Sequence, residues 1–188
     1  MRKIFLCAAA LFCALSLGAQ NKSDILSKIA KAPVRSEAVT GRFTEVRTPM
    51  SKEAAKVTLK GKLVFKTEGF LSMLYDNKEQ FTIDGDKMVV DRDGTVMVYN
   101  LTKNLMMKGL SEILLCSFRG TLEDLAKVQD ADIEARVEGS RYVVTLTPRK
   151  KTPRGCSKLV VSYDKASCAI KDMRIDEMTG ASTFYSMD

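Results

Sequence analysis

Alternation of apolar and polar residues, broken by short turn sequences, most constrains what this chain can fold into. Residues 57–66 place Leu63 and Phe65 on one side of an extended segment and lysines on the other. The same alternation recurs in four further segments, at residues 70–75, 79–83, 87–91 and 95–99. Turn sequences such as Asp76-Asn77 and Asp84-Gly85 separate these segments. The middle of the chain is therefore predicted to be an antiparallel meander.

Helical spacing appears in only a few places. Residues 22–32 carry apolar residues on one helical stripe and are followed by Pro33, which predicts one short amphipathic helix. Between Asn104 and Val128 a second stripe and a helix start at Thr121 predict two more short helices, inserted between strands.

Strand alternation then resumes to the end of the chain, at residues 133–137, 142–146, 159–163, 169–175 and 181–186. About ten strands with few helices between them predict a mainly β, α+β fold built on one antiparallel sheet. Such a sheet must curl to bury one face. We therefore expect an incomplete β-barrel, with the short helices as a lid over a hydrophobic cavity.

The N-terminus has the pattern of a secretory signal peptide. Two basic residues precede an apolar run of about 14 residues, and small residues stand before Gln20. The run is shorter than the roughly 20 residues that a membrane-spanning helix needs. We expect residues 1–19 to be removed and residues 20–188 to form one soluble domain in the periplasm.

Composition excludes several kinds of chemistry. The chain has no histidine, which removes every catalytic site that pairs serine or cysteine with histidine and every imidazole metal ligand. The net charge of +7 is spread over alternating patterns, which is typical of a solvated surface. We expect no nucleic-acid partner for an exported chain. No metal site or cofactor is predicted. Whether any disulfide forms among Cys116, Cys156 and Cys168 stays open, since their spacing requires none.

A family resemblance rests on the order of several short sequences. Gly41-Arg42-Phe43-Thr44-Glu45 is followed by Gly61-Lys62-Leu63-Val64-Phe65-Lys66, residues 70–75, Ile83-Asp84-Gly85 and the helical insertion. In this order the chain resembles a divergent branch of the periplasmic LolA-type carriers of outer-membrane lipoproteins. The resemblance implies a non-enzymatic chaperone that binds lipoprotein acyl chains and carries them from the inner to the outer membrane. It also implies an inner-membrane release complex and an outer-membrane acceptor as partners of a monomeric carrier.

The resemblance also assigns roles to individual positions. The acyl-binding residues that it implies are Phe43, Leu63, Phe65, Leu71, Met73 and Tyr75 on strands, and Leu110, Ile113 and Leu114 on the lid. One position departs from the better-known branch, where an arginine latches the lid by hydrogen bonds to helix backbone. Here that position is Thr67, whose side chain is too short to do the same.

Two other functions stay open from the sequence. A periplasmic carrier of a free lipid or glycolipid would share the fold and differ only in cargo. A hydrolase using paired carboxylates is the more distant alternative, because the acidic residues alternate outward with lysines. Methionines gather in the predicted half-barrel and lid, which favours an adaptable apolar surface.

Overall fold

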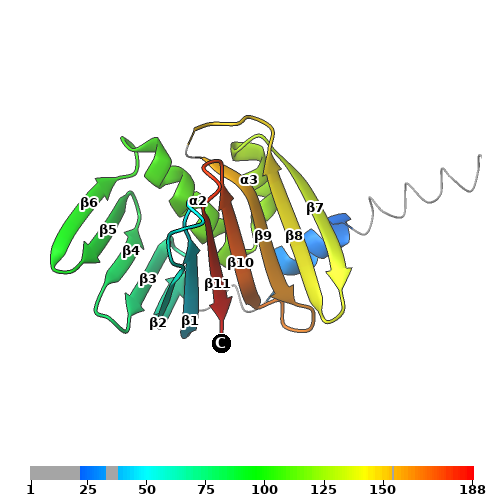
Figure 1. The fold of residues 1–188 in the computed structure, drawn as a ribbon. Coiled ribbons are helices and arrows are strands. Elements are labelled where there is room, and N and C mark those ends of the chain that lie inside the picture. The colour runs from blue at the N-terminus through cyan, green and yellow to red at the C-terminus, as the bar shows by residue number, and fades with distance from the viewer. Residues whose placement is uncertain (1–21, 33–37, 154) are drawn as a thin grey trace, which may run out of the picture.

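The fold is built on a single antiparallel sheet that curves without closing (Figure 1). The computed structural model describes residues 22–32, 38–153 and 155–188. The strands are β1 (Val39–Thr48), β2 (Val57–Lys66), β3 (Phe70–Tyr75), β4 (Gln80–Asp84), β5 (Lys87–Arg92), β6 (Thr95–Asn100), β7 (Ala131–Glu138), β8 (Arg141–Pro148), β9 (Cys156–Asp164), β10 (Ile170–Glu177) and β11 (Ser182–Met187). The predicted fold class is confirmed.

Two meanders form this sheet, and its middle is made by β1 and β11, the first and last strands of the sheet. The strand order is β6-β5-β4-β3-β2-β1-β11-β10-β9-β8-β7. β1 and β11 pair in antiparallel register, with Phe43 opposite Met187 and Glu45 opposite Tyr185. This pairing joins the early and the late strands into one surface, and it leaves β6 and β7 as the edges.

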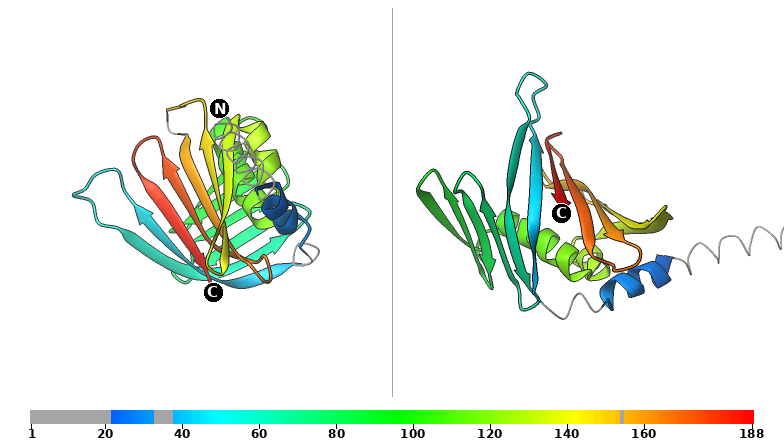
Figure 2. Two further views of the ribbon diagram at one scale, coloured as in Figure 1. Left: turned by 90° about the vertical axis from the view of Figure 1, so that its right-hand side faces the viewer. Right: turned by 90° about the horizontal axis from the view of Figure 1, so that it is seen from below.

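The helices between the meanders cross the concave side of the sheet. α2 (Leu105–Arg119) and α3 (Leu122–Val128) connect β6 at one edge to β7 at the other, and Figure 2 shows them inside the curve. The Asn104 side chain caps the start of α2 by accepting from the Met107 N–H. Gly120 ends it in the left-handed conformation, with a φ of 73°.

A helix over residues 22–30 precedes the sheet, as its spacing predicts. It buries Ile25, Leu26 and Ile29 in the same hydrophobic core as the sheet and α2. The predicted stop at Pro33 and the predicted signal peptide at residues 1–19 lie outside the described residues.

The core fills the space between the concave face and the helices. Strand alternation sends every second residue inward, and Leu63, Phe65 and Leu71 are all nearly inaccessible to solvent. Gly61 belongs to this packing, because a Cβ built there would lie 2.3 Å from the Leu74 carbonyl oxygen and 2.9 Å from the Phe43 ring. Only glycine lets Phe43 approach the backbone of β2 this closely.

Candidate acyl-chain binding surface

The structure places all nine predicted acyl-binding residues in one hydrophobic core or packed against it. Leu63 lies opposite Met73, and Phe65 lies opposite Leu71, so these four residues form adjacent pairs on the concave face. Phe43 meets Tyr75 edge to face, with ring centroids 5.2 Å apart. From α2, Ile113 and Leu114 are buried and Leu110 is half-buried.

The lid helix packs directly on these strands. The ring of Phe118, near the end of α2, stacks on Phe65 with centroids 5.4 Å apart. Phe65 and Leu71 each have 0% of their surface exposed, and Met73 has 2%. In the structure the predicted binding residues are therefore packed against each other and against α2.

Apolar surface becomes accessible toward β6. One continuous row of the concave face runs through Leu63, Met73, Phe81, Val90 and Met97 by strand pairing. The first two are buried, the next two are half-buried, and Met97 is 38% exposed. On α2, Met107 and Leu110 are also half-buried. The concave face and the first half of α2 thus form a partly open apolar rim.

A small hollow opens where β1 meets the end of α2. Its volume is about 210 Å³, and its apolar lining includes Leu63, Phe118 and Ile170. Pockets that enclose a small molecule usually measure ~300 to 1,000 Å³. The hollow therefore has room for only part of such a ligand while α2 is in this position.

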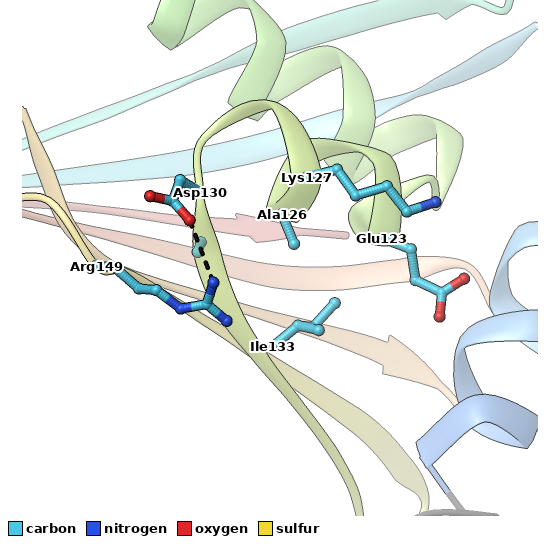
Figure 3. A pocket seen from close by; sticks show the side chains of 7 residues that line it. Glu123, Ala126, Lys127, Asp130, Ile133 and Arg149 are labelled. Carbon is cyan, nitrogen blue, oxygen red and sulfur yellow. Dashed lines mark hydrogen bonds and ion pairs between the residues drawn. The ribbon is translucent and has the colours of Figure 1, made fainter.

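A second hollow lies outside this surface, between α3 and β7 (Figure 3). It has a volume of about 390 Å³, and Lys127, Asp130 and Arg149 line it together with apolar residues. Figure 3 shows Arg149 pointing at Asp130, and their ion pair measures 3.2 Å. None of the predicted acyl-binding residues lines this hollow.

The end of α2 is fastened to the sheet by hydrogen bonds to backbone. Arg119 donates from Nε to the Thr67 carbonyl oxygen at 3.2 Å, and Tyr163 donates its hydroxyl to the Ser117 carbonyl oxygen at 2.8 Å. Position 67 thus touches the lid through its backbone, and the arginine is supplied by the helix. Sequence reasoning missed Arg119, although an arginine at the end of a predicted lid helix was a visible signal.

A buried polar cluster lies beside the apolar surface, and the sequence analysis did not anticipate it. The Glu45 side chain is 2% exposed, so this acid faces inward and corrects the expectation that the acidic residues point outward. It accepts hydrogen bonds of 2.5 Å from both Arg47 Nε and the Tyr75 hydroxyl. The alternation of Phe43, Glu45 and Arg47 on one strand was the signal that could have shown this.

The two tyrosines near Glu45 are held in their neutral form. Burial, followed by the charge of the Glu45 carboxylate, raises the pKa of Tyr75 well above its usual value. The same two causes raise the pKa of Tyr185. Both phenols stay protonated, and the Tyr75 hydroxyl donates to the carboxylate. The cluster ends the apolar surface on this side, because an acyl chain placed there would separate the polar partners.

Other chemical features of the described residues are few. They contain no group of three or more histidine, cysteine or acidic residues placed to hold a metal ion. Cys116 and Cys156 are free thiols in the structure, and burial raises the pKa of Cys156 to about 11. No helix in this part of the chain is both long enough and apolar enough to cross a membrane.

Comparison with known proteins gave matches only among solved structures. No protein-family model matches the chain, and no curated protein matches it. A LolA superfamily protein from Nitrosomonas europaea is similar at 8% identity and a TM-score of 0.41, over 89% of this chain and 91% of that one. The LolA-type family that the sequence resembles is thus present among the similar structures.

Two further solved structures are similar over most of their length. The lipoprotein LppX of Mycobacterium tuberculosis has 12% identity and a TM-score of 0.42, over 88% of this chain and 94% of that one. A domain from Vibrio parahaemolyticus described as an outer membrane lipoprotein-sorting protein has 15% identity and a TM-score of 0.43, over 90% of this chain and 91% of that one. All three TM-scores lie below 0.5.

Proposed function

We propose that this protein is a non-enzymatic carrier that binds the acyl chains of lipoproteins between its concave sheet and α2. In this proposal residues 20–188 are the mature carrier, which takes cargo in the periplasm from an inner-membrane donor to an outer-membrane acceptor. The observation that carries it is the row from buried Leu63 to exposed Met97, an apolar surface continuous from the core to solvent. Such a surface can accept a chain from one end without unfolding the sheet.

The energetics favour a partly open surface over a closed cavity. Complete burial of a 16-carbon chain contributes roughly 12 kcal/mol at ~0.8 kcal/mol per methylene, which is too tight for rapid release. A surface that is buried at one end and exposed at the other covers part of the chain. Met73, Met97 and Met107 are on it, and their unbranched side chains can refill space as cargo enters and leaves.

Loading requires α2 to move. The hollow beside Phe118 is too small for a whole chain, and Phe118 stacks on Phe65 in the closed state. Displacing the helix breaks the bond between Arg119 and Thr67, which joins residues 52 positions apart. Opening therefore also breaks the bond between Tyr163 and Ser117 and uncovers the buried apolar side chains of α2, which bound cargo would cover in place of the sheet.

Ligand binding at the lid is tested by a matched pair of substitutions on α2. Leu110→Glu places a charge on the half-buried side of the helix, whereas Leu105→Glu places one on a side chain that is 78% exposed. We expect Leu110→Glu to weaken binding of a fluorescent fatty-acid probe at least tenfold and Leu105→Glu to leave it unchanged. Equal effects of the two variants, in proteins with matched melting temperatures, would contradict the proposal.

Native mass spectrometry of protein purified from its own periplasm identifies the cargo. A bound lipid-modified polypeptide supports the lipoprotein carrier, and a bound free lipid or glycolipid supports the alternative carrier. Recovery of neither, together with no binding of the fatty-acid probe, would contradict both.

A further inference from the structure

Gly41 lies in the interior of β1, where the backbone does not require a glycine. A glycine inside a strand weakens the strand, and it often marks an irregularity, a close approach of another backbone or a ligand site. β1 pairs with β2 in unbroken register from Val39 to Arg47, and the backbone of Gly41 is not left-handed. A Cβ built at Gly41 would lie 3.7 Å from its nearest neighbour, which is an ordinary van der Waals contact. A ligand site is the reason that remains.

Gly41 occupies the position at which the apolar row of the concave face reaches β1. It alternates with the inward-facing Phe43, and it pairs with Leu63, the buried end of the row that runs to Met97. The hollow of about 210 Å³ lies at this position, and its lining includes Gly41, Leu63 and Ile170. Because Gly41 has no side chain, the row continues into the hollow at the point where a larger residue would fill it.

The sheet forms part of this hollow whether or not α2 is in place. Gly41, Leu63 and Ile170 are on β1, β2 and β10, whereas Phe118 comes from α2. When α2 moves to admit cargo, strand pairing holds the three sheet residues in place relative to one another. The hollow is thus a fixed end of the apolar surface.

We propose that the hollow receives the methyl end of an acyl chain and that Gly41 determines how long a chain the protein accepts. The methyl end fits better than the polar end, because a polar group between Leu63 and Ile170 would lose its hydrogen bonds to water. The polar end of the chain then lies toward Met97, which is 38% exposed. This role of Gly41 rests on the proposed carrier function and adds chain length to the properties that the cargo must have.

Chain-length selectivity tests the role of Gly41. Palmitate and its shorter homologue laurate each compete with the fluorescent fatty-acid probe, which gives the affinity of each. Gly41→Leu fills the hollow, and we expect it to weaken palmitate binding at least tenfold, since each methylene kept out costs about fourfold in affinity. Laurate has the shorter chain and should bind this variant as it binds the wild type.

Two further variants separate this effect from damage to the fold. Gly41→Ala adds one methyl group that makes only ordinary contacts, so the denaturation midpoint should not fall. Palmitate binding should still weaken about fourfold in this variant. Thr44→Leu adds a leucine to the outer face of the same strand and is the matched control, which should leave both affinities unchanged.

The same titrations distinguish failure of this proposal from failure of the carrier function. A wild-type protein that binds neither fatty acid would overturn both. If the wild type binds both fatty acids and Gly41→Leu weakens the two equally, or weakens neither, the carrier function stands and the role of Gly41 is overturned.

Photocrosslinking tests the direction of the chain. Palmitate with a diazirine at its methyl end should crosslink to the peptides that contain Leu63 or Ile170, whereas a diazirine next to the carboxylate should crosslink near Met97. Peptide mass spectrometry identifies both sets. The reverse pattern would place the carboxylate beside Lys171, an exposed residue that also lines the hollow, and would overturn the proposal.

Discussion

Arg119, the last residue of α2, donates from Nε to the backbone carbonyl oxygen of Thr67 in the turn between β2 and β3, across 3.2 Å. In the better-known branch of the family that the sequence resembles, an arginine at this position on the sheet reaches the lid backbone. Here the arginine is on the lid and the accepting carbonyl is on the sheet. A short side chain at position 67 is compatible with a fastened lid, because that side chain takes no part in the bond.

Arg119→Ala should therefore speed release of a bound fatty-acid probe about tenfold, because a hydrogen bond from a charged donor contributes ~1.5 kcal/mol. Thr67→Ala keeps the carbonyl oxygen and should leave the release rate unchanged. Stopped-flow displacement of the probe measures both. If the Arg119→Ala variant released the probe at the wild-type rate, the bond between Arg119 and Thr67 would not hold the lid.

Leu71→Glu and Met73→Glu should each lower the free energy of unfolding by about 4 kcal/mol or more, because each puts a charge among fully packed side chains. Leu74→Glu is the matched control on the same strand, since Leu74 is 49% exposed, and it should change stability by less than about 0.5 kcal/mol. Urea denaturation measures all three. If Leu71→Glu or Met73→Glu kept the wild-type free energy of unfolding, α2 would leave an open cavity above β3.

Glu45→Ala should cost about 3 kcal/mol of stability, since it leaves Arg47 and the Tyr75 hydroxyl without their shared acceptor. Glu138→Ala is a control at the same spacing, because Glu138 is 52% exposed and pairs with Arg136. It should change stability by less than about 0.5 kcal/mol. Denaturant unfolding measures both variants. If they lost similar amounts of unfolding free energy, the burial of Glu45 would have no structural role.

Stability should fall as pH rises above about 10, where an unfolded tyrosine ionises. Burial raises the pKa of Tyr75 in the folded protein, so the unfolded chain loses this proton first and is favoured by up to ~1.4 kcal/mol per pH unit. Tyr75→Phe should be less stable at pH 7 and should show a shallower decline from pH 10 to 11. Parallel declines in the two proteins would contradict this assignment.

The mature protein should begin at or near Gln20 and be recovered in the soluble periplasmic fraction, because residues 4–17 are apolar but too short to span a bilayer. N-terminal sequencing of the native protein measures the start. Retention of Met1 in a membrane fraction would contradict both the cleavage and the proposed site of action.

The strands and most of their boundaries could be read from local sequence. Alternation at period two and turn sequences such as Asp84-Gly85 act over a few residues, so they indicate β4, β5 and the turn between them without knowledge of the rest of the chain. The six strand residues implied by the resemblance also fall on inward positions for this reason. Alternation assigns a face, and the inner face of a curled sheet is the apolar one.

Contacts between distant segments were decided only in three dimensions. The pairing of Glu45 with Tyr185 depends on β1 meeting β11 from the far end of the chain. Arg119 and Thr67 meet because α2 crosses from one sheet edge to the other. Whether the inner face is open or filled depends on how deeply this helix sits. That depth follows from close packing of Phe118 on Phe65, which depends on the assembled shapes of both surfaces and has no local pattern in the sequence.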